Sequence, residues 1–136
     1  MRAKLSGIAA GLALLLSAST LLAHHSPAAQ YDPSKSLTLE GTVTKFEWTN
    51  PHTWLHMDVK QPDGTTVSWA IEGGAPNALI RRGATKDLIK PGMQVVVEGS
   101  PARDGSAHLI GRTVKTPEGR NVFVLSVAGE TPEQPR

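Results

Sequence analysis

Four of the five histidines in this chain fall into two pairs whose side chains suit transition-metal binding. His24 and His25 are adjacent near the N-terminus, and His52 and His56 are four residues apart in the middle of the chain. Imidazole nitrogens suit copper and zinc, and an N-terminal amine beside its own imidazole forms the compact chelate of histidine-brace copper sites. We therefore predict a copper site made of His24, its amine and His25, assisted by His52 or His56.

The spacing of the second pair limits this prediction. On an extended strand His52 and His56 share a face but lie about 13 Å apart at the backbone. One ion therefore needs the N-terminal pair together with one of them, or with His108 from a neighbouring strand. The chain has no Cys, and no closed zinc pattern occurs. The competing interpretation is a mobile N-terminus and surface histidines that titrate without holding a metal.

The three tryptophans are a second group of candidate residues, because their rings would stack on a ligand. Trp48, Trp54 and Trp69 would form a stacking platform for a ring-shaped ligand if all three lay on one sheet face, with Asn50 in the loop at its mouth. The alternative places Trp69 in the core and Trp48 at a barrel corner, which leaves Trp54 alone at the surface.

Catalysis has little support in the sequence. Ser26 near His25 and Asp58 near His56 belong to no recognisable nucleophile elbow, and no glycine-rich phosphate loop is present. We predict a non-catalytic binding or accessory module rather than a hydrolytic enzyme, with a small ligand or a periplasmic protein as its partner.

The first 23 residues predict the cellular location of the protein. Arg2 and Lys4 precede an uncharged, Leu- and Ala-rich stretch over residues 5–22, which is the form of a secretory signal peptide. Cleavage after Ala23 would make His24 the N-terminal residue, whereas cleavage after Ser19 would leave an apolar stub before it. An uncleaved anchor is the further alternative. We predict a periplasmic protein of a Gram-negative bacterium, with no stable membrane span after cleavage.

The charge balance argues against nucleic acid as a partner. Removal of residues 1–23 takes two of the fourteen basic residues, and the twelve that remain match the twelve acidic ones. A neutral mature chain lacks the excess of positive charge that drives binding to phosphate backbones.

Strands are the elements that must position these side chains, because apolar and polar residues alternate from residue 37 onward. In the second strand the core-facing set is Thr53, Leu55, Met57 and Val59, so that the neighbouring histidines and Trp54 face outward. Phe46 and Trp48 fall out of phase with the start of the first strand, which predicts a bulge near Gly41 or Lys45.

The order of elements predicts the fold class. Three strands, a short helix over residues 76–83 and two or three further strands predict a mainly β fold. We expect a small OB-like Greek-key barrel of five or six strands, with one short helix between strands 3 and 4. An antiparallel sheet with one helix is the alternative. The predicted domain organisation is a signal peptide over 1–23, an extended arm over 24–36, the barrel over 37–127 and a disordered tail over 128–136.

Several short motifs carry a resemblance to a known family. They are Ala23-His24-His25-Ser26, Tyr31-Asp32, Glu40-Gly41-Thr42-Val43, Trp48-Thr49-Asn50-Pro51-His52, Pro76-Asn77-Ala78-Leu79, Arg81-Arg82-Gly83, Lys90-Pro91-Gly92 and Val97-Glu98-Gly99. With them the chain resembles a family of small, uncharacterised, exported proteobacterial proteins that contain a domain of unknown function. The resemblance covers nearly the whole mature chain. It implies export and a barrel-like fold, and it supplies no activity.

Overall fold

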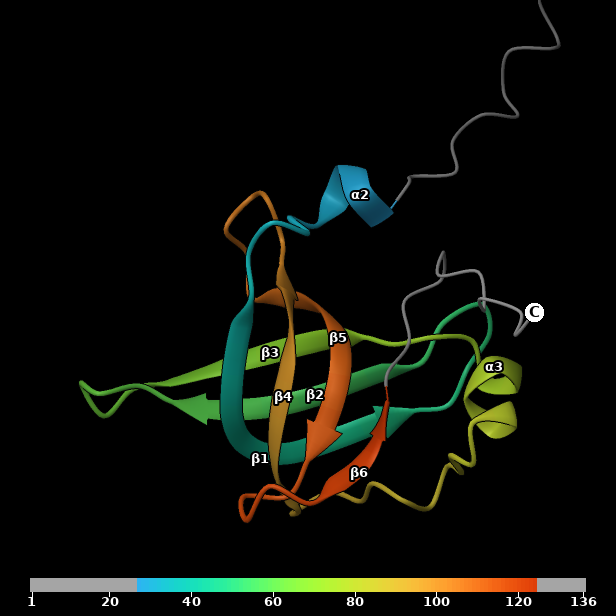
Figure 1. The fold of residues 1–136 in the computed structure, drawn as a ribbon. Coiled ribbons are helices and arrows are strands. Elements are labelled where there is room, and N and C mark those ends of the chain that lie inside the picture. The colour runs from blue at the N-terminus through green and yellow to red at the C-terminus, as the bar shows by residue number, and fades with distance from the viewer. Residues whose placement is uncertain (1–26, 125–136) are drawn as a thin grey trace, which may run out of the picture.

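The alternating sequence forms six strands and two short helices in the computed structural model, which describes residues 27–124 (Figure 1). In chain order they are α2 (Pro27–Gln30), β1 (Leu37–Glu47), β2 (Trp54–Lys60), β3 (Thr66–Glu72), α3 (Pro76–Arg81), β4 (Gln94–Pro101), β5 (His108–Lys115) and β6 (Asn121–Val124). The helix predicted between strands 3 and 4 is α3, which begins with a proline in its first turn.

The strands close into a barrel. The sheet order is β3-β2-β1-β4-β5-β6, and a short parallel pairing between β3 and β5 joins the two sides of the sheet. That pairing sets Ala70 opposite His108 and Glu72 opposite Ile110. Five strands therefore form the closed barrel, and β6 extends β5 as an antiparallel neighbour. This connectivity, with one helix after the third strand, confirms the predicted OB-like barrel.

The inner face of the barrel carries the residues that the alternation predicted. Thr53, Leu55 and Met57 are fully buried and Val59 is 8% exposed, so the intervening side chains of β2 point outward. The core continues through β1, β4 and β5, and Leu79 of α3 joins it with no exposed surface. The helix thus packs against the barrel through this leucine.

A bulge in β1 brings its second half back into phase, as predicted. The register with β2 shifts between Val43 and Lys45, so Phe46 packs against the core although it is out of phase with Val43. Close approach of β1 and β2 also explains Gly41, because a Cβ atom there would overlap the backbone carbonyl of Asp58. Figure 1 shows the strong curvature of β1 that results.

The segment before β1 is tied to the barrel. Residues 27–30, inside the segment predicted as an extended arm, form the single helical turn α2. The backbone amide of Arg103 donates to the Gln30 carbonyl, and the amide of Asp32 donates to the Pro101 carbonyl. Tyr31 between them forms an isolated antiparallel bridge with Ala102. These contacts hold residues 30–32 against residues 101–103.

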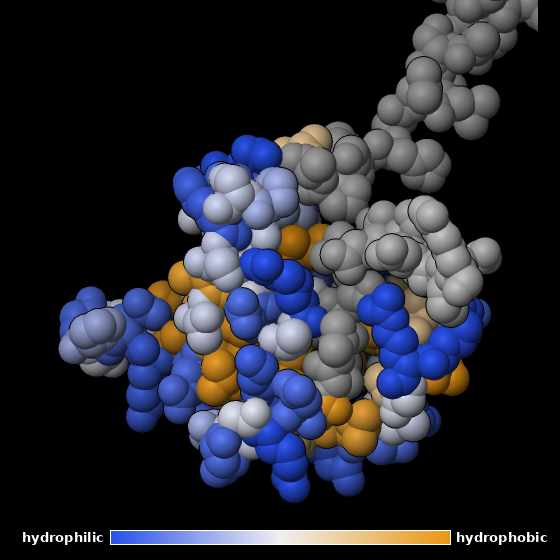
Figure 2. Space-filling model, in the orientation of Figure 1, coloured by the Kyte–Doolittle hydropathy of each residue, from blue (hydrophilic) through white to orange (hydrophobic). Residues whose placement is uncertain are grey.

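The predicted signal peptide and the tail over residues 128–136 lie outside the described residues, as do His24 and His25. No helix between residues 27 and 124 is both long and apolar enough to cross a membrane. On the face drawn in Figure 2, hydrophilic and hydrophobic residues are interspersed.

Candidate functional site

A buried threonine brings His52 beside Glu72. Thr53 has no exposed surface, and both its amide and its hydroxyl donate to the Gly74 carbonyl at 3.1 and 3.0 Å. The amide of Gly73 donates in return to the Thr53 carbonyl at 2.9 Å. Because these bonds fix the start of β2 against the end of β3, the residues on either side of the clamp lie next to each other.

Glu72 links His52 to a buried tyrosine. His52 Nδ1 lies 2.5 Å from Glu72 Oε1, and the Tyr31 hydroxyl donates to Glu72 Oε2 at 2.7 Å. Tyr31 is 2% exposed and Glu72 is 7% exposed, whereas the His52 side chain is 29% exposed. The carboxylate is therefore nearly enclosed, and only its histidine partner reaches solvent.

The hydrogen bonds of this cluster determine the tautomer of His52. Burial and the bond to Glu72 raise the pKa of Tyr31, so its hydroxyl stays protonated and donates a hydrogen bond to the carboxylate. Glu72 accepts at both oxygens, so Nδ1 of His52 carries a proton. In the neutral imidazole the lone pair is then on Nε2, the nitrogen that faces away from Glu72.

Tyr31 is itself held by the barrel. Its ring forms a small buried cluster with Ala102 and Ile110, and Ile110 is the register partner of Glu72. The next residue, Asp32, accepts from the hydroxyl and the amide of Ser34 at 2.6 and 3.1 Å.

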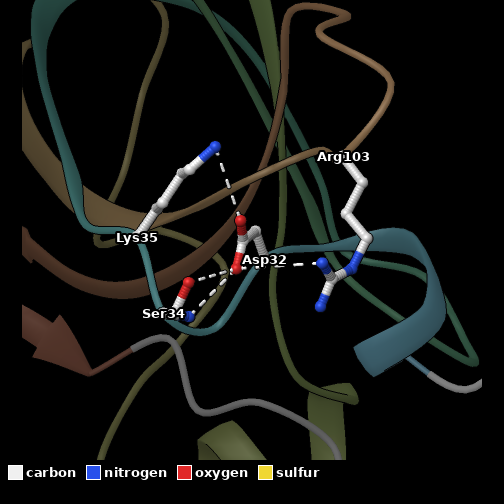
Figure 3. A network of polar contacts seen from close by, with 4 residues as sticks. All are labelled: Asp32, Ser34, Lys35 and Arg103. Carbon is white, nitrogen blue, oxygen red and sulfur yellow. Dashed lines mark hydrogen bonds and ion pairs between the residues drawn. The ribbon is translucent and has the colours of Figure 1, made fainter.

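Asp32 also holds two cations close by, Lys35 at 3.5 Å and Arg103 at 3.9 Å (Figure 3). The hydroxyl bond from Ser34 contributes most to holding the pKa of Asp32 below its usual range. The segment that leads to the N-terminus is thus anchored at the candidate site.

The structure does not bring His56 to His52. His56 lies on the outer face of β2, where its register neighbours are Lys45 on β1 and Ala70 on β3. Its Nε2 is buried without a hydrogen bond and lies 3.6 Å from Glu47 Oε1, which also pairs with Lys45. The Lys45 ammonium holds the pKa of Glu47 below its usual range, with a smaller contribution from His56. His52 and His56 therefore each have a carboxylate of their own.

His108 lies nearer to His56 than sequence spacing suggests. The register runs from His56 through Ala70 to His108 across three adjacent strands, and both imidazoles line one shallow groove of about 470 Å³. Nδ1 of His108 lies 3.0 Å from the Ser106 hydroxyl, which donates to Asp104 at 2.6 Å. The outlying histidine of the sequence is thus part of the outer face of the barrel.

The tryptophans predicted as a platform lie in two environments. Trp48 and Trp69 pack against the core, and Trp48 also meets Phe46 edge to face with ring centroids 5.7 Å apart. Trp54 lies on the outer face, in register with Glu47 and Glu72. Asn50 is exposed in the loop that ends at His52. Trp54 is thus the tryptophan beside Glu72 of the candidate site, while Trp69 also lines the groove that His56 and His108 share.

The described part of the chain does not form a complete metal cage from its own side chains. Between residues 27 and 124, no three His, Cys, Asp or Glu side chains come together as ion ligands. A tightly held ion at His52 would therefore need ligands from outside this range, and His24 and His25 are the candidates in the sequence.

Sequence reasoning missed Glu72 and Tyr31. Glu72 follows the buried Ile71 directly and precedes two glycines, so a charged residue at the end of a core strand was a usable signal. Tyr31 belongs to the Tyr31-Asp32 motif, which by itself indicates no role for the hydroxyl. The pairing of the two spans 41 residues, and such a separation leaves no periodic trace in the sequence.

Comparison with known proteins identifies a family for the chain. A family described as "Family of unknown function (DUF6152)" matches residues 12–111. No curated protein matches the chain.

Proposed function

The chain belongs to DUF6152, a family of unknown function, and from its site we propose that it is an exported, non-catalytic binding module that holds copper. The ion would be bound by His52 Nε2 together with the imidazoles of His24 and His25 and the amine that signal cleavage would free. The proposal includes a periplasmic location, which the signal-like residues 1–23 support.

The observation that carries this proposal is the 2.5 Å contact between His52 Nδ1 and Glu72. Histidines that bind metals almost always donate their other ring N–H to a carboxylate, a carbonyl or water, which fixes the tautomer and raises the basicity of the ligating nitrogen. Glu72 does this for His52, and it is itself fixed by Tyr31. The side chain is partly exposed, so an ion has access to it from solvent.

The length of the arm is compatible with a shared ion. Tyr31 fixes the arm at Glu72, and His25 precedes Tyr31 by six residues, four of which form the compact turn α2. With 1.5 Å per helical residue and at most about 3.6 Å per extended residue, a chain of this length can span up to about 16 Å. This tether is long enough for the imidazoles of the arm to meet the imidazole of His52.

A small-ligand or protein-partner module is the second candidate. It is favoured by Trp54, which lies on the outer face in register with Glu47 and Glu72. Its partly exposed indole suits a ring-shaped or cationic group through stacking and cation–π contact. Under this alternative Trp54→Ala would abolish binding, and His52→Ala would leave it intact.

Intact mass spectrometry of protein purified from the periplasm of its host tests the proposed function. Denaturing spectra give the N-terminus, and native spectra with one equivalent of Cu(II) give the retained metal. We expect a chain that begins at His24 and retains one copper, which is lost in His24→Ala and in His52→Ala. Lys60→Ala, at the exposed end of β2, is the control and should retain the ion. A different N-terminus, or retention unaffected by His52→Ala, would contradict the proposal.

A further inference from the structure

We propose a second metal site in the groove between His56 and His108, which binds a Cu(I) ion through two imidazole nitrogens. It goes beyond the proposed function because it uses neither the N-terminal arm nor His52. The shape of the groove, the tautomers of the two rings and the charges behind them support this site.

The groove exists because a small residue separates two imidazoles. In the sheet register Ala70 stands between His56 and His108 on the outer face, and all three line the depression. With neighbouring strands about 4.8 Å apart, the backbones of the two histidines are about 10 Å apart. Imidazoles that lean over the alanine methyl group from both sides can meet one ion at a bond length of about 2.0 Å each.

Hydrogen bonding fixes the tautomer of His108. The Ser106 hydroxyl has one hydrogen, and it uses this hydrogen in its 2.6 Å hydrogen bond to Asp104. In the 3.0 Å contact with His108 the hydroxyl oxygen is therefore the acceptor, and Nδ1–H of His108 is the donor. The lone pair of His108 is then on Nε2. Asp104 and Ser106 thus act for His108 as Glu72 does for His52, through one intervening hydroxyl.

Electrostatics favours the corresponding arrangement at His56. Its Nε2 faces the carboxylate of Glu47 at 3.6 Å, which favours the proton on that nitrogen and leaves the lone pair on Nδ1. Both rings therefore offer one unprotonated nitrogen while a carboxylate lies behind the other. The two neutral imidazole nitrogens suit copper. Cu(I) in particular accepts two such donors in a linear arrangement. Asp104, behind Ser106, compensates its charge, whereas Glu47 is already paired with Lys45, which also lines the groove.

Anaerobic titration of the mature protein with Cu(I), in competition with the chelator bicinchoninate, tests this site. We expect the affinity for Cu(I) at the groove to fall at least tenfold in His56→Ala and in His108→Ala. Ala70→Leu should have the same effect, because its side chain fills the space between the rings and leaves both histidines in place. His52→Ala is the matched control and should leave Cu(I) binding at the groove unchanged.

The outcomes separate this site from the proposed one. Loss of Cu(I) in His52→Ala or His24→Ala, with His56→Ala and His108→Ala unaffected, would overturn the groove site and leave the arm site standing. Loss in the groove variants alone supports it, whether or not the arm binds Cu(II). Thermal unfolding of each variant shows whether a loss of binding reflects a loss of the fold. Ala70→Leu then shows whether the groove binds Cu(I), because both imidazole rings are still present.

Discussion

Removal of the Tyr31 hydroxyl tests the buried cluster most sharply. Tyr31→Phe keeps the ring against Ala102 and Ile110 and deletes only the 2.7 Å bond to Glu72. Both residues are less than a tenth exposed, so water has little room to replace the lost donor. A hydrogen bond to a charged group contributes about 1.5–3 kcal/mol. The folding equilibrium constant should therefore fall by about 10- to 150-fold.

Urea unfolding monitored by tryptophan fluorescence measures this loss. At a slope of about 1–3 kcal/mol per molar urea, the midpoint should move down by about 1 M while the slope stays constant. Ser68→Ala is the matched control, because it deletes a 2.7 Å bond to Asp58 on the exposed outer face. We expect that control to change stability by no more than about 0.5 kcal/mol. A loss in Tyr31→Phe no larger than in the control would refute the account of the cluster.

Three further predictions concern the barrel and its arm. Leu79→Ala should cost about 2–5 kcal/mol in urea unfolding because this helix residue is fully buried, whereas Ile80→Ala, 55% exposed, should cost less than about 0.5. Gly41→Ala should lower the melting temperature markedly, since its Cβ would overlap the backbone of β2; an unchanged melting temperature would contradict the close approach. The bond from the Ser34 hydroxyl keeps the pKa of Asp32 below its ordinary value of 3.8. The ionised carboxylate therefore stabilises the fold above that pH, and this stabilisation is lost as the pH falls through the lowered pKa. Asp32→Asn should therefore show a weaker loss of stability between pH 5 and pH 2 than the wild-type chain, and equal losses would argue against the anchoring role.

The barrel was predictable because its core residues alternate with polar residues along each strand. Leu55 and Met57 are buried where a period of two places them, and the mismatch at Phe46 predicted the bulge that the register shift confirms. Each of these inferences needs only residues a few positions apart. The helical turn α2 was not predicted. Its last residue, Gln30, accepts from the backbone amide of Arg103, which is far away in the sequence.

Of the candidate site, the sequence predicted the outward position of His52, because the alternation in the second strand places its aliphatic residues in the core. The carboxylate partner of His52 depends on the clamp between Thr53 and Gly74. Likewise, His108 was an outlier in sequence and becomes a neighbour of His56 only through the parallel pairing of β3 and β5. Barrel closure brings together strands that are far apart in the chain, and no spacing rule within one strand anticipates that.

The affinity of the mature protein for Cu(II) in the Glu72→Gln variant tests the central claim most directly. The glutamine amide has one acceptor oxygen for the two donors that Glu72 now satisfies, so His52 loses the partner that fixes its tautomer. Loss of such a partner typically weakens metal binding about 10- to 100-fold. We predict a rise of that size in the Kd measured by isothermal titration calorimetry, with Glu40→Gln, which changes an exposed carboxylate on β1, at the wild-type value. A folded Glu72→Gln protein with an unchanged Kd would contradict the claim that Glu72 prepares His52 to bind copper.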